Sequence, residues 1–508
     1  MANIQANVAE EQRLFDLEVA EIETWWKSSK QAHVIRTYTA SDVAALRSSL
    51  PISYPSSTQA LKLWAILQKH RQAGTAELTF GMIDPLLASQ MEGQCTIYIS
   101  GALCAFSAAE CIGQDTSDYP WDTVPLAAER VFRSQQYHDR RQRQYRMQSS
   151  PAERAHMASP RDFLQPIVAD ADMGFGTTTA TMKLTKRMVE AGVAMFHLDD
   201  LALGGKSWTG GEGHTVVSTA EYLKRLAAAR LQLDIMGAET MIMCRCDTYD
   251  AQWITSNHDP RDQPYILGAT VPLGQAASSC ATPEERSVWG REARLMTFDD
   301  AVKASATVTQ YSEYTTLLAQ KTPATLADRR RVARQVLGGQ DVFFDWDLPR
   351  VTDGRYRFAP TMKALIDRTA AAAAWGDVTW ARMGLSIPRL REFHDGLSEI
   401  YPGRLFAGGY GATTDFSAQG FSFDDVKDLH RTLAAMGMVW QVQPGFAMQG
   451  LNHVTSRFSR MWSEEGMGGY FRDIQHPAMA ANADTYEKME WSGGYLADAY
   501  GDVLRIKY

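Results

Sequence analysis

Three apolar runs in this chain end in charged side chains that could bind a metal ion or a carboxylate. The runs are residues 167–169, 193–196 and 241–243. The charged residues that follow them are Asp170 and Asp172, then His197, Asp199 and Asp200, then Arg245 and Asp247. Side chains at the carboxyl ends of parallel strands converge on one spot. Carboxylates brought together repel one another unless a cation or a raised pKa relieves them. The pattern predicts a metal-dependent α/β enzyme that binds Mg²⁺ or a similar hard cation.

The elements that would position these residues alternate between strands and helices. Strands are expected near residues 97, 168, 195, 242, 378, 405 and 440, with helical stretches between them. An eighth strand is expected near residues 79–84, where Leu78-Thr79-Phe80-Gly81-Met82 is short and apolar. This alternation is typical of a parallel sheet, and eight such strands close a barrel. The predicted fold class is therefore α/β, a (β/α)8 TIM-type barrel.

We expect further helical segments around this barrel. A stretch rich in Pro, Gly, Ser and Thr, residues 255–298, interrupts the alternation, and mostly helical sequence follows it. The expected organisation is a helical N-terminal segment (1–78), a first part of the barrel (79–254), an inserted, mostly helical segment (255–350), a second part of the barrel (351–450) and a helical C-terminal tail (451–508).

The composition excludes several classes of function. The 508 residues are 45% hydrophobic and 22% charged, as in ordinary globular proteins, and the net charge of −8 argues against nucleic-acid binding. The one basic run, residues 138–146, is interrupted by polar residues and is expected to be a solvated or interface helix face. No stretch approaches the roughly 20 apolar residues of a membrane span. Without a secretion or peroxisomal signal, we expect a cytoplasmic protein with no membrane partner.

The residues around the first run resemble those of a known family. Phe163-Leu164-x-Pro166-Ile167-Val168-Ala169-Asp170-Ala171-Asp172-x-Gly174-x-Gly176 is similar to the metal-binding signature of isocitrate lyases, which belong to the isocitrate lyase / phosphoenolpyruvate mutase superfamily. Further similarity is carried by residues 61–67, 118–125, 182–186, 229–237, 345–350 and 491–493. The chain resembles the long, fungal-type isocitrate lyases over nearly its full length. The resemblance implies a barrel, Mg²⁺ (or Mn²⁺), a small-molecule carboxylate substrate and a homotetramer that exchanges helices.

The chain departs from this family at positions that matter for the reaction. The family's mobile loop reads Lys-Lys-Cys-Gly-His, and its cysteine is the general acid. Here the aligned residues are Lys206-Ser207-Trp208-Thr209-Gly210. An indole cannot act as a proton donor near neutral pH. The family's Ser-Gly-Trp appears here as Ser100-Gly101-Ala102. Its Asn-x-Ser-x-Ser appears as Gly409-Tyr410-Gly411-Ala412-Thr413, and Arg382 replaces the glutamate of its Trp-x-Glu-Ser.

The resemblance implies a role for each candidate site residue. The metal ligands would be Asp170, Asp172, Asp115 and Asp199, and the catalytic residues Tyr98, His197 and Arg245. Substrate would contact Ser100, Gly101, Ala102, Trp208, Arg245, Arg382, Gly409 and Thr413. Structural roles compete with some of these. Tyr98 and His197 could be core residues, Arg245 could be a structural ion-pair partner, and Trp208 could merely fill space. Arg382 could pair with a displaced family carboxylate such as Asp199 rather than with a ligand. His214 and Lys206 are expected to be solvated loop residues.

Three functions are compatible with this pattern. The first is a divergent, Mg²⁺-dependent carbon–carbon lyase, or a related rearrangement or elimination enzyme. It would act on a 2-oxo or 2-hydroxy carboxylate bulkier or less polar than isocitrate, as in fungal specialised metabolism. The second is a non-catalytic paralogue that assembles with or regulates an isocitrate lyase. The third is a true isocitrate or methylisocitrate lyase with a substitute acid. We expect the first, because loss of the general acid costs about 10²–10⁴-fold in rate.

Overall fold

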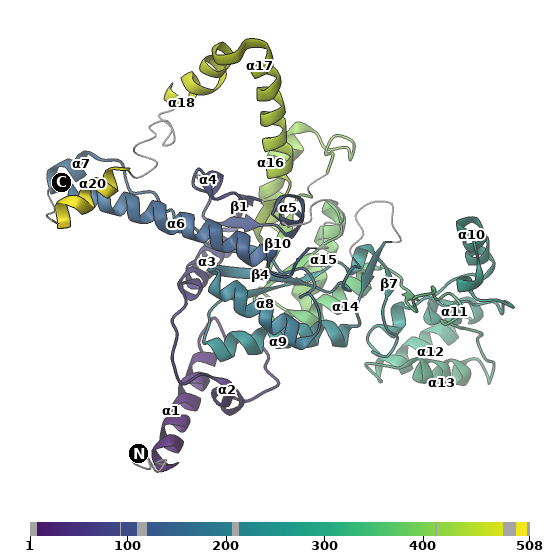
Figure 1. Ribbon diagram of the computed structural model, residues 1–508. Helices are drawn as coiled ribbons and strands as arrows, with labels where there is room; N and C mark the ends of the chain where they lie inside the picture. Colours follow the sequence, from purple (N-terminus) through teal and green to yellow (C-terminus); the bar gives the residue numbers. More distant parts are fainter. Residues whose placement is uncertain are drawn as a thin grey trace.

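The computed structural model describes residues 8–91, 93–108, 119–205, 213–411, 414–480 and 494–504. Its centre is a barrel of eight parallel strands that follow one another around the barrel in chain order (Figure 1). A single parallel bridge between Gly81 and Tyr98 links the first strand to the second. The strands are β1 (Glu77–Phe80), β2 (Ile97–Ile99), β3 (Ile167–Asp170), β4 (Val193–Asp199), β6 (Met241–Cys246), β9 (Val378–Ala381), β10 (Leu405–Gly409) and β11 (Met438–Gln443). The predicted fold class is confirmed, and the eighth strand, predicted near residues 79–84, is β1 at Glu77–Phe80.

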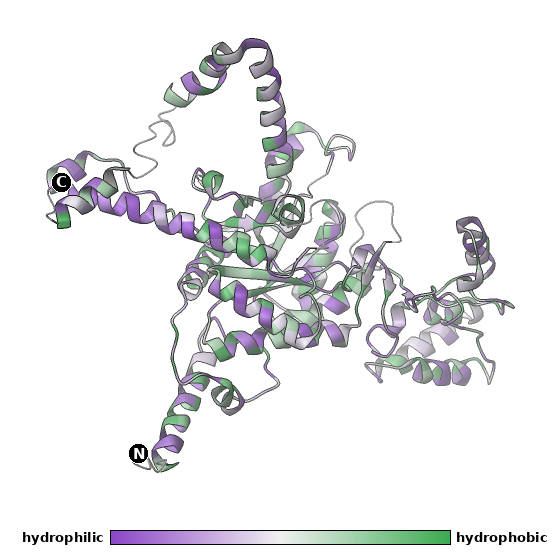
Figure 2. Cartoon of the chain, viewed as in Figure 1, coloured by the Kyte–Doolittle hydropathy of each residue, from purple (hydrophilic) through white to green (hydrophobic). Residues whose placement is uncertain are grey.

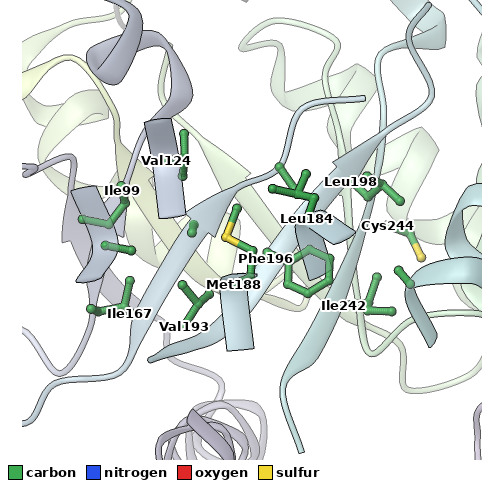
Figure 3. Packing of buried hydrophobic residues seen from close by; sticks show 14 of the residues in the cluster. Ile99, Val124, Ile167, Leu184, Met188, Val193, Phe196, Leu198, Ile242 and Cys244 are labelled. Carbon is green, nitrogen blue, oxygen red and sulfur yellow. The ribbon is translucent and has the colours of Figure 1, made fainter. Parts of the chain in front are cut away.

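Helices on the outside of the barrel cover one face of these strands. Every residue of β3, β4 and β6 is buried, which explains why these strands are continuous apolar runs. Figure 3 shows their outward side chains, among them Ile167, Val193 and Ile242, in one layer with Leu184 and Met188 of α8. The helices after the barrel strands are α5 (Gly101–Ser107), α6 (Thr123–Gln148), α8 (Thr178–Glu190), α9 (Thr219–Met236), α14 (Met362–Ala373), α15 (Ile387–Ile400) and α16 (Phe423–Ala434), with short α4 (Pro85–Ala88) and α7 (Pro151–His156).

The interior of the barrel is filled by side chains and closed by one helix of the N-terminal segment. Tyr98, Met195, Met243 and Trp440 lie in a buried cluster with Leu63 and Leu67 of α3 (Pro55–Ala73). Two helices before it, α1 (Val8–Trp26) and α2 (Ala40–Leu46), pack against α9 through a small apolar cluster. Because side chains fill the interior, we expect ligands to bind at the carboxyl ends of the strands and not inside the barrel.

A second, small sheet lies above the barrel strands and was not predicted. It consists of β5 (His214–Val216), β7 (Ala251–Ile254) and β8 (Tyr356–Arg357). Beyond it, α10 (Pro283–Glu292), α11 (Phe298–Ser305), α12 (Val308–Ala319) and α13 (Leu326–Val336) form a lobe that Figure 1 draws away from the barrel. Helices α11 to α13 share a buried cluster of their own around Phe298 and Tyr314.

The described residues of the last part of the chain are largely helical, as expected. Its helices are α17 (Asn452–Tyr470), α18 (His476–Ala480) and α20 (Gly494–Leu504). In Figure 1, α17 reaches away from the barrel. The basic run of residues 138–146 lies in α6, much of which is hydrophilic in Figure 2. Within the part of the chain that the structure describes, no helix has both the length and the apolar character needed to cross a membrane.

Candidate active site

The charged residues identified in the sequence meet at the carboxyl ends of three neighbouring strands. Asp170 of β3 lies opposite His197 of β4, and Asp199 of β4 lies opposite Arg245 of β6. All four side chains are buried. Parallel pairing in this register therefore brings together residues that lie up to 75 positions apart in the sequence.

Three of these residues form a cluster that could bind a metal ion. Nε2 of His197 lies 3.2 Å from Oδ1 of Asp170, and its Nδ1 lies 3.1 Å from Oδ1 of Asp199. One ligand atom from each residue lies within 4.8 Å of the other two. Two buried carboxylates fit a hard cation such as Mg²⁺, and an imidazole nitrogen is also an acceptable ligand for Mn²⁺. His197, which was expected to be catalytic, is thus placed among the metal-ligand candidates.

Asp172 is buried next to this cluster but is held by other partners. Its backbone φ is 42°, in the left-handed region, which aspartate tolerates better than most residues. Its N–H donates to Oδ1 of Asp170 over 2.9 Å, and its carboxylate accepts a hydrogen bond from the hydroxyl of Tyr119. Burial and the Asp172 charge raise the pKa of Tyr119 well above its usual value, so that this phenol keeps its proton. A metal-binding role for Asp172 stays a prediction.

The segment from Tyr98 to Gly101 lies beside Asp170. Ser100 caps α5, where its hydroxyl accepts from the N–H of Leu103 over 3.3 Å. The N–H of Gly101 donates to Oδ2 of Asp170 over 3.1 Å. A Cβ at position 101 would approach that oxygen to 2.9 Å and would also clash with the Tyr119 hydroxyl, so only glycine fits. Ala102 follows in α5 and is half-buried.

Tyr98 connects this segment to the histidine of the cluster. Its hydroxyl lies 3.1 Å from Nε2 of His197, and its ring packs edge-on against Trp440 inside the barrel. Burial raises the pKa of Tyr98 well above its usual value, and the charge of Asp170 adds to the effect. Tyr98 is therefore a protonated phenol that can donate a hydrogen bond at the site.

Arg245 is the buried cation of the site, and two of its nitrogens are already bonded. Its Nε and Nη2 donate to the two carboxylate oxygens of Asp247 over 2.8 and 2.9 Å. Its guanidinium lies 4.7 Å from the ring centre of Trp380, and its Nε lies 3.6 Å from Asp199. Burial opposes the charge of Asp247, but Arg245 outweighs this effect and holds the pKa of Asp247 below its usual range.

Arg382 and His214 lie close together beside Asp247. Arg382 lies 3.8 Å from Asp247, 3.4 Å from Asp250 and 2.9 Å from Nε2 of His214, and its pairing with Asp199 stays a prediction. The expectation that His214 is a solvated loop residue is wrong, since it is 3% exposed. The reason is that His214 begins β5, which pairs with β7 over the barrel strands.

The remaining candidate residues are only partly placed. Gly409 ends β10, and a Cβ there would approach Cζ2 of Trp380 to 2.9 Å, so the indole occupies the space of a longer side chain. Asp115, Trp208 and Thr413 lie outside the described residues, as does the segment that contains Lys206.

Sequence reasoning did not assign three residues that the structure brings to the site. Tyr119 contacts Asp172, Trp380 lies against Arg245, and Asp247 binds Arg245 from the same strand end. Of these three, only Asp247 could have been predicted from the sequence. It stands two residues after Arg245, and alternate residues of a strand lie on the same face. The partners of Tyr119 and Trp380 lie 53 or more positions away.

Comparison with known proteins gives consistent matches. The sequence profile described as the isocitrate lyase family matches residues 18–506. The mitochondrial 2-methylisocitrate lyase of Schizosaccharomyces pombe is 47% identical over 501 residues, covering 96% of each chain. The isocitrate lyase of Oryza sativa subsp. japonica is 37% identical over 533 residues, covering 99% of this chain and 92% of the relative. A crystal structure of 2,3-dimethylmalate lyase is 15% identical with a TM-score of 0.41, covering 82% of this chain and 87% of the other.

Proposed function

Because this chain belongs to the isocitrate lyase family, we propose that it cleaves a carbon–carbon bond of 2-methylisocitrate, or of a close analogue, and releases pyruvate and succinate. The observation that carries the proposal is the 47% identity to a 2-methylisocitrate lyase along 96% of both chains. The substitution of the loop cysteine by Trp208 made this the least expected of the three functions. The comparisons favour it over a substrate of another kind.

The reaction consists of one bond cleavage and two proton transfers. A proton leaves the hydroxyl of the substrate, the bond between the hydroxyl-bearing carbon and its neighbour breaks, and the electron pair stays on that neighbouring carbon. A proton must then reach this carbon to give succinate. When bound by Asp170, His197 and Asp199, Mg²⁺ would act as a Lewis acid toward the substrate oxygens.

The chain's own residues support the other parts of this reaction. The protonated Tyr98 can donate a hydrogen bond to an oxygen that gains negative charge. Arg245 can bind a substrate carboxylate, to which its planar guanidinium is suited. Since residue 208 is tryptophan, the proton for the carbon must come from a group other than a loop cysteine.

A direct assay tests this function. Purified protein is supplied with Mg²⁺ and 2-methylisocitrate, and pyruvate is followed with lactate dehydrogenase and NADH. We expect pyruvate formation that EDTA abolishes and that exceeds glyoxylate formation from isocitrate. The Asp170→Asn variant provides the blank. Pyruvate formation no faster than in this blank would overturn the proposal.

A less polar substrate is the second candidate, and one observation favours it. Gly409 presents no polar side chain, and the Trp380 indole fills the adjacent space. Such a wall suits an apolar group better than a carboxylate. If 2-methylisocitrate is not cleaved but bulkier 2-alkyl analogues are, this candidate replaces the first. The non-catalytic alternative is the least supported, because a scaffold has no need for a buried cluster of two carboxylates and a histidine.

We further propose that the protein acts in mitochondria rather than in the cytoplasm, because the S. pombe relative is named as mitochondrial. Fractionation of cells that express the full chain with a C-terminal tag tests this location. Recovery of the tag only in the cytosolic fraction would contradict it.

A further inference from the structure

The cation expected to bind substrate already has a strong partner. Asp247 binds Arg245 in a bidentate manner, through Nε at 2.8 Å and Nη2 at 2.9 Å. The face of the guanidinium lies against Trp380, and Asp199 approaches Nε to 3.6 Å. A substrate carboxylate that binds both outer nitrogens of Arg245 must therefore compete with Asp247 for Nη2.

The charge balance opposes the arrival of another carboxylate. Arg245 and Asp247 form an ion pair of opposite charges, and both side chains are buried. A further carboxylate placed among them is unfavourable unless another cation compensates. The described residues supply such a cation close to Asp247.

That cation is Arg382, which contacts Asp247 more loosely. Its Nη1 lies 3.8 Å from Oδ2 of Asp247, the same oxygen that binds Nη2 of Arg245. His214 lies 3.9 Å from this oxygen and 2.9 Å from Nη1 of Arg382, and Asp250 lies 3.4 Å from Nε of Arg382. Moving Oδ2 roughly 1 Å toward Arg382 would turn a loose ion pair into a charge-assisted hydrogen bond.

We propose that Asp247 is a positioning residue that changes partner when substrate binds. In the unliganded protein it orients Arg245 by the bidentate bond. When a substrate carboxylate binds Arg245, Asp247 moves toward Arg382 and His214, and Arg382 compensates its charge. The inference rests on the proposed role of Arg245 in binding substrate, and it assigns to Arg382 an action through Asp247 rather than on the substrate.

A double-mutant cycle on binding tests this exchange separately from catalysis. The probe is pyruvate in the presence of Mg²⁺, and its Kd is measured by calorimetry for wild type, Arg382→Gln, Asp247→Asn and the double variant. We expect Arg382→Gln to weaken binding about tenfold, a typical coupling between sites. In the Asp247→Asn background the same change should alter Kd by less than about twofold. Arg431→Gln, which removes an exposed arginine paired with Asp428, should not change Kd.

Two results would overturn the exchange. One is an equal effect of Arg382→Gln in both backgrounds, which would mean that Arg382 acts on the ligand directly. The other is no effect in either background, including the case in which pyruvate does not bind. Pyruvate binding that follows the expected cycle, in a protein that does not cleave 2-methylisocitrate, would refute the proposed function and leave the exchange intact.

A crystal structure of wild type with pyruvate and Mg²⁺ provides a test that does not depend on folding of the variants. We expect the distance from Nη1 of Arg382 to Oδ2 of Asp247 to fall from 3.8 Å to about 2.9 Å. The bond from Asp247 to Nη2 of Arg245 should lengthen at the same time. A bidentate Arg245–Asp247 pair that persists with pyruvate bound to Arg245 would refute the exchange.

Discussion

At the scale of single residues, Asp170 is the point at which the metal-ligand cluster meets the Ser100–Gly101 segment. One of its oxygens faces His197, and the other accepts the N–H of Gly101. Replacing Asp170 by Asn keeps the shape but removes the charge that a divalent cation requires. We expect Asp170→Asn to weaken Mn²⁺ or Mg²⁺ binding by more than about 100-fold, since even changes behind the ligands cost 10–100-fold.

Mn²⁺ binding followed by electron paramagnetic resonance measures this loss. Asp424→Asn is the matched control, because Asp424 is an exposed aspartate in the first turn of α16. Equal Mn²⁺ affinity in Asp170→Asn and wild type would contradict the assignment of Asp170 as a metal ligand.

The sequence indicated which charged residues lie at the strand ends but not which of their side chains contact one another. Asp170, His197 and Asp199 were identified, because each directly follows or ends an apolar run. Their distances depend on strand register, which places His197 between the two carboxylates. The network of Asp247, Arg382 and His214 joins three separate segments through side chains. No local pattern specifies such contacts.

At the scale of secondary-structure elements, a substitution that leaves a cavity under α3 tests whether this helix closes the barrel. Leu67 of α3 is fully buried in the cluster that contains Tyr98 and Trp440. Because Leu→Ala in a core leaves a cavity, we expect Leu67→Ala to lower the free energy of unfolding by about 2–5 kcal/mol. Leu61→Ala on the same helix is the control, since Leu61 is 48% exposed and should change it by less than about 0.5 kcal/mol. Urea unfolding compares the two, and equal losses would show that α3 does not close the barrel in solution.

The packing of α15 on β10 predicts a pH dependence. His394 of α15 is buried, stacks on Phe406 of β10 with ring centres 4.1 Å apart, and lies 3.0 Å from the carbonyl of Met436. Burial lowers its pKa from 6.5 to about 4. Between these values the unfolded chain binds more protons than the folded one, so this contribution to stability is complete above pH 6.5 and is lost as the pH falls toward 4.

We therefore expect wild type to lose about 2 kcal/mol more than His394→Gln between pH 7 and pH 5. The measurement is urea unfolding at the two pH values. Substitution of His156, which is exposed on α7, serves as the control and should leave the pH dependence of wild type unchanged. A pH dependence that is the same in His394→Gln and wild type would show that this histidine does not cause it.

Long periodic elements could be predicted from the sequence, and short paired strands could not. The barrel strands are mostly buried runs of three to seven residues, and most are separated by helices, which gives a clear alternation. The sheet of β5, β7 and β8 contains strands of two to four residues from distant segments. This sheet is stabilised by pairing between distant segments, so no local pattern in residues 214–216 predicts it. Missing this sheet is the reason that His214 was expected in solvent.

At the scale of the whole molecule, α17 has an apolar surface that the rest of the described chain leaves exposed. Trp462 and Met467 of α17 are 45% and 63% exposed, and Phe471, which follows this helix, is 53% exposed. A hollow of about 310 Å³ lies between Phe458, Trp462, Met467 and Tyr470. Figure 1 shows α17 extending away from the barrel. Monomeric proteins rarely expose an apolar patch of this kind, so a protein partner is expected there. The homotetramer implied by the family resemblance makes a second copy of this chain the predicted partner.

A pair of substitutions in α17 tests the predicted tetramer. Trp462→Glu combined with Met467→Glu places two negative charges on the apolar surface, and burying unpaired charges in an interface costs several kcal/mol. Light scattering after size exclusion should give about four times the 56.5 kDa of one chain for wild type and a smaller mass for the variant. Val308→Glu is the control, because Val308 is 89% exposed on α12, far from α17 in sequence, and should leave the mass unchanged. A wild-type mass of one chain, or a double variant that keeps the wild-type mass, would show that α17 does not join the copies.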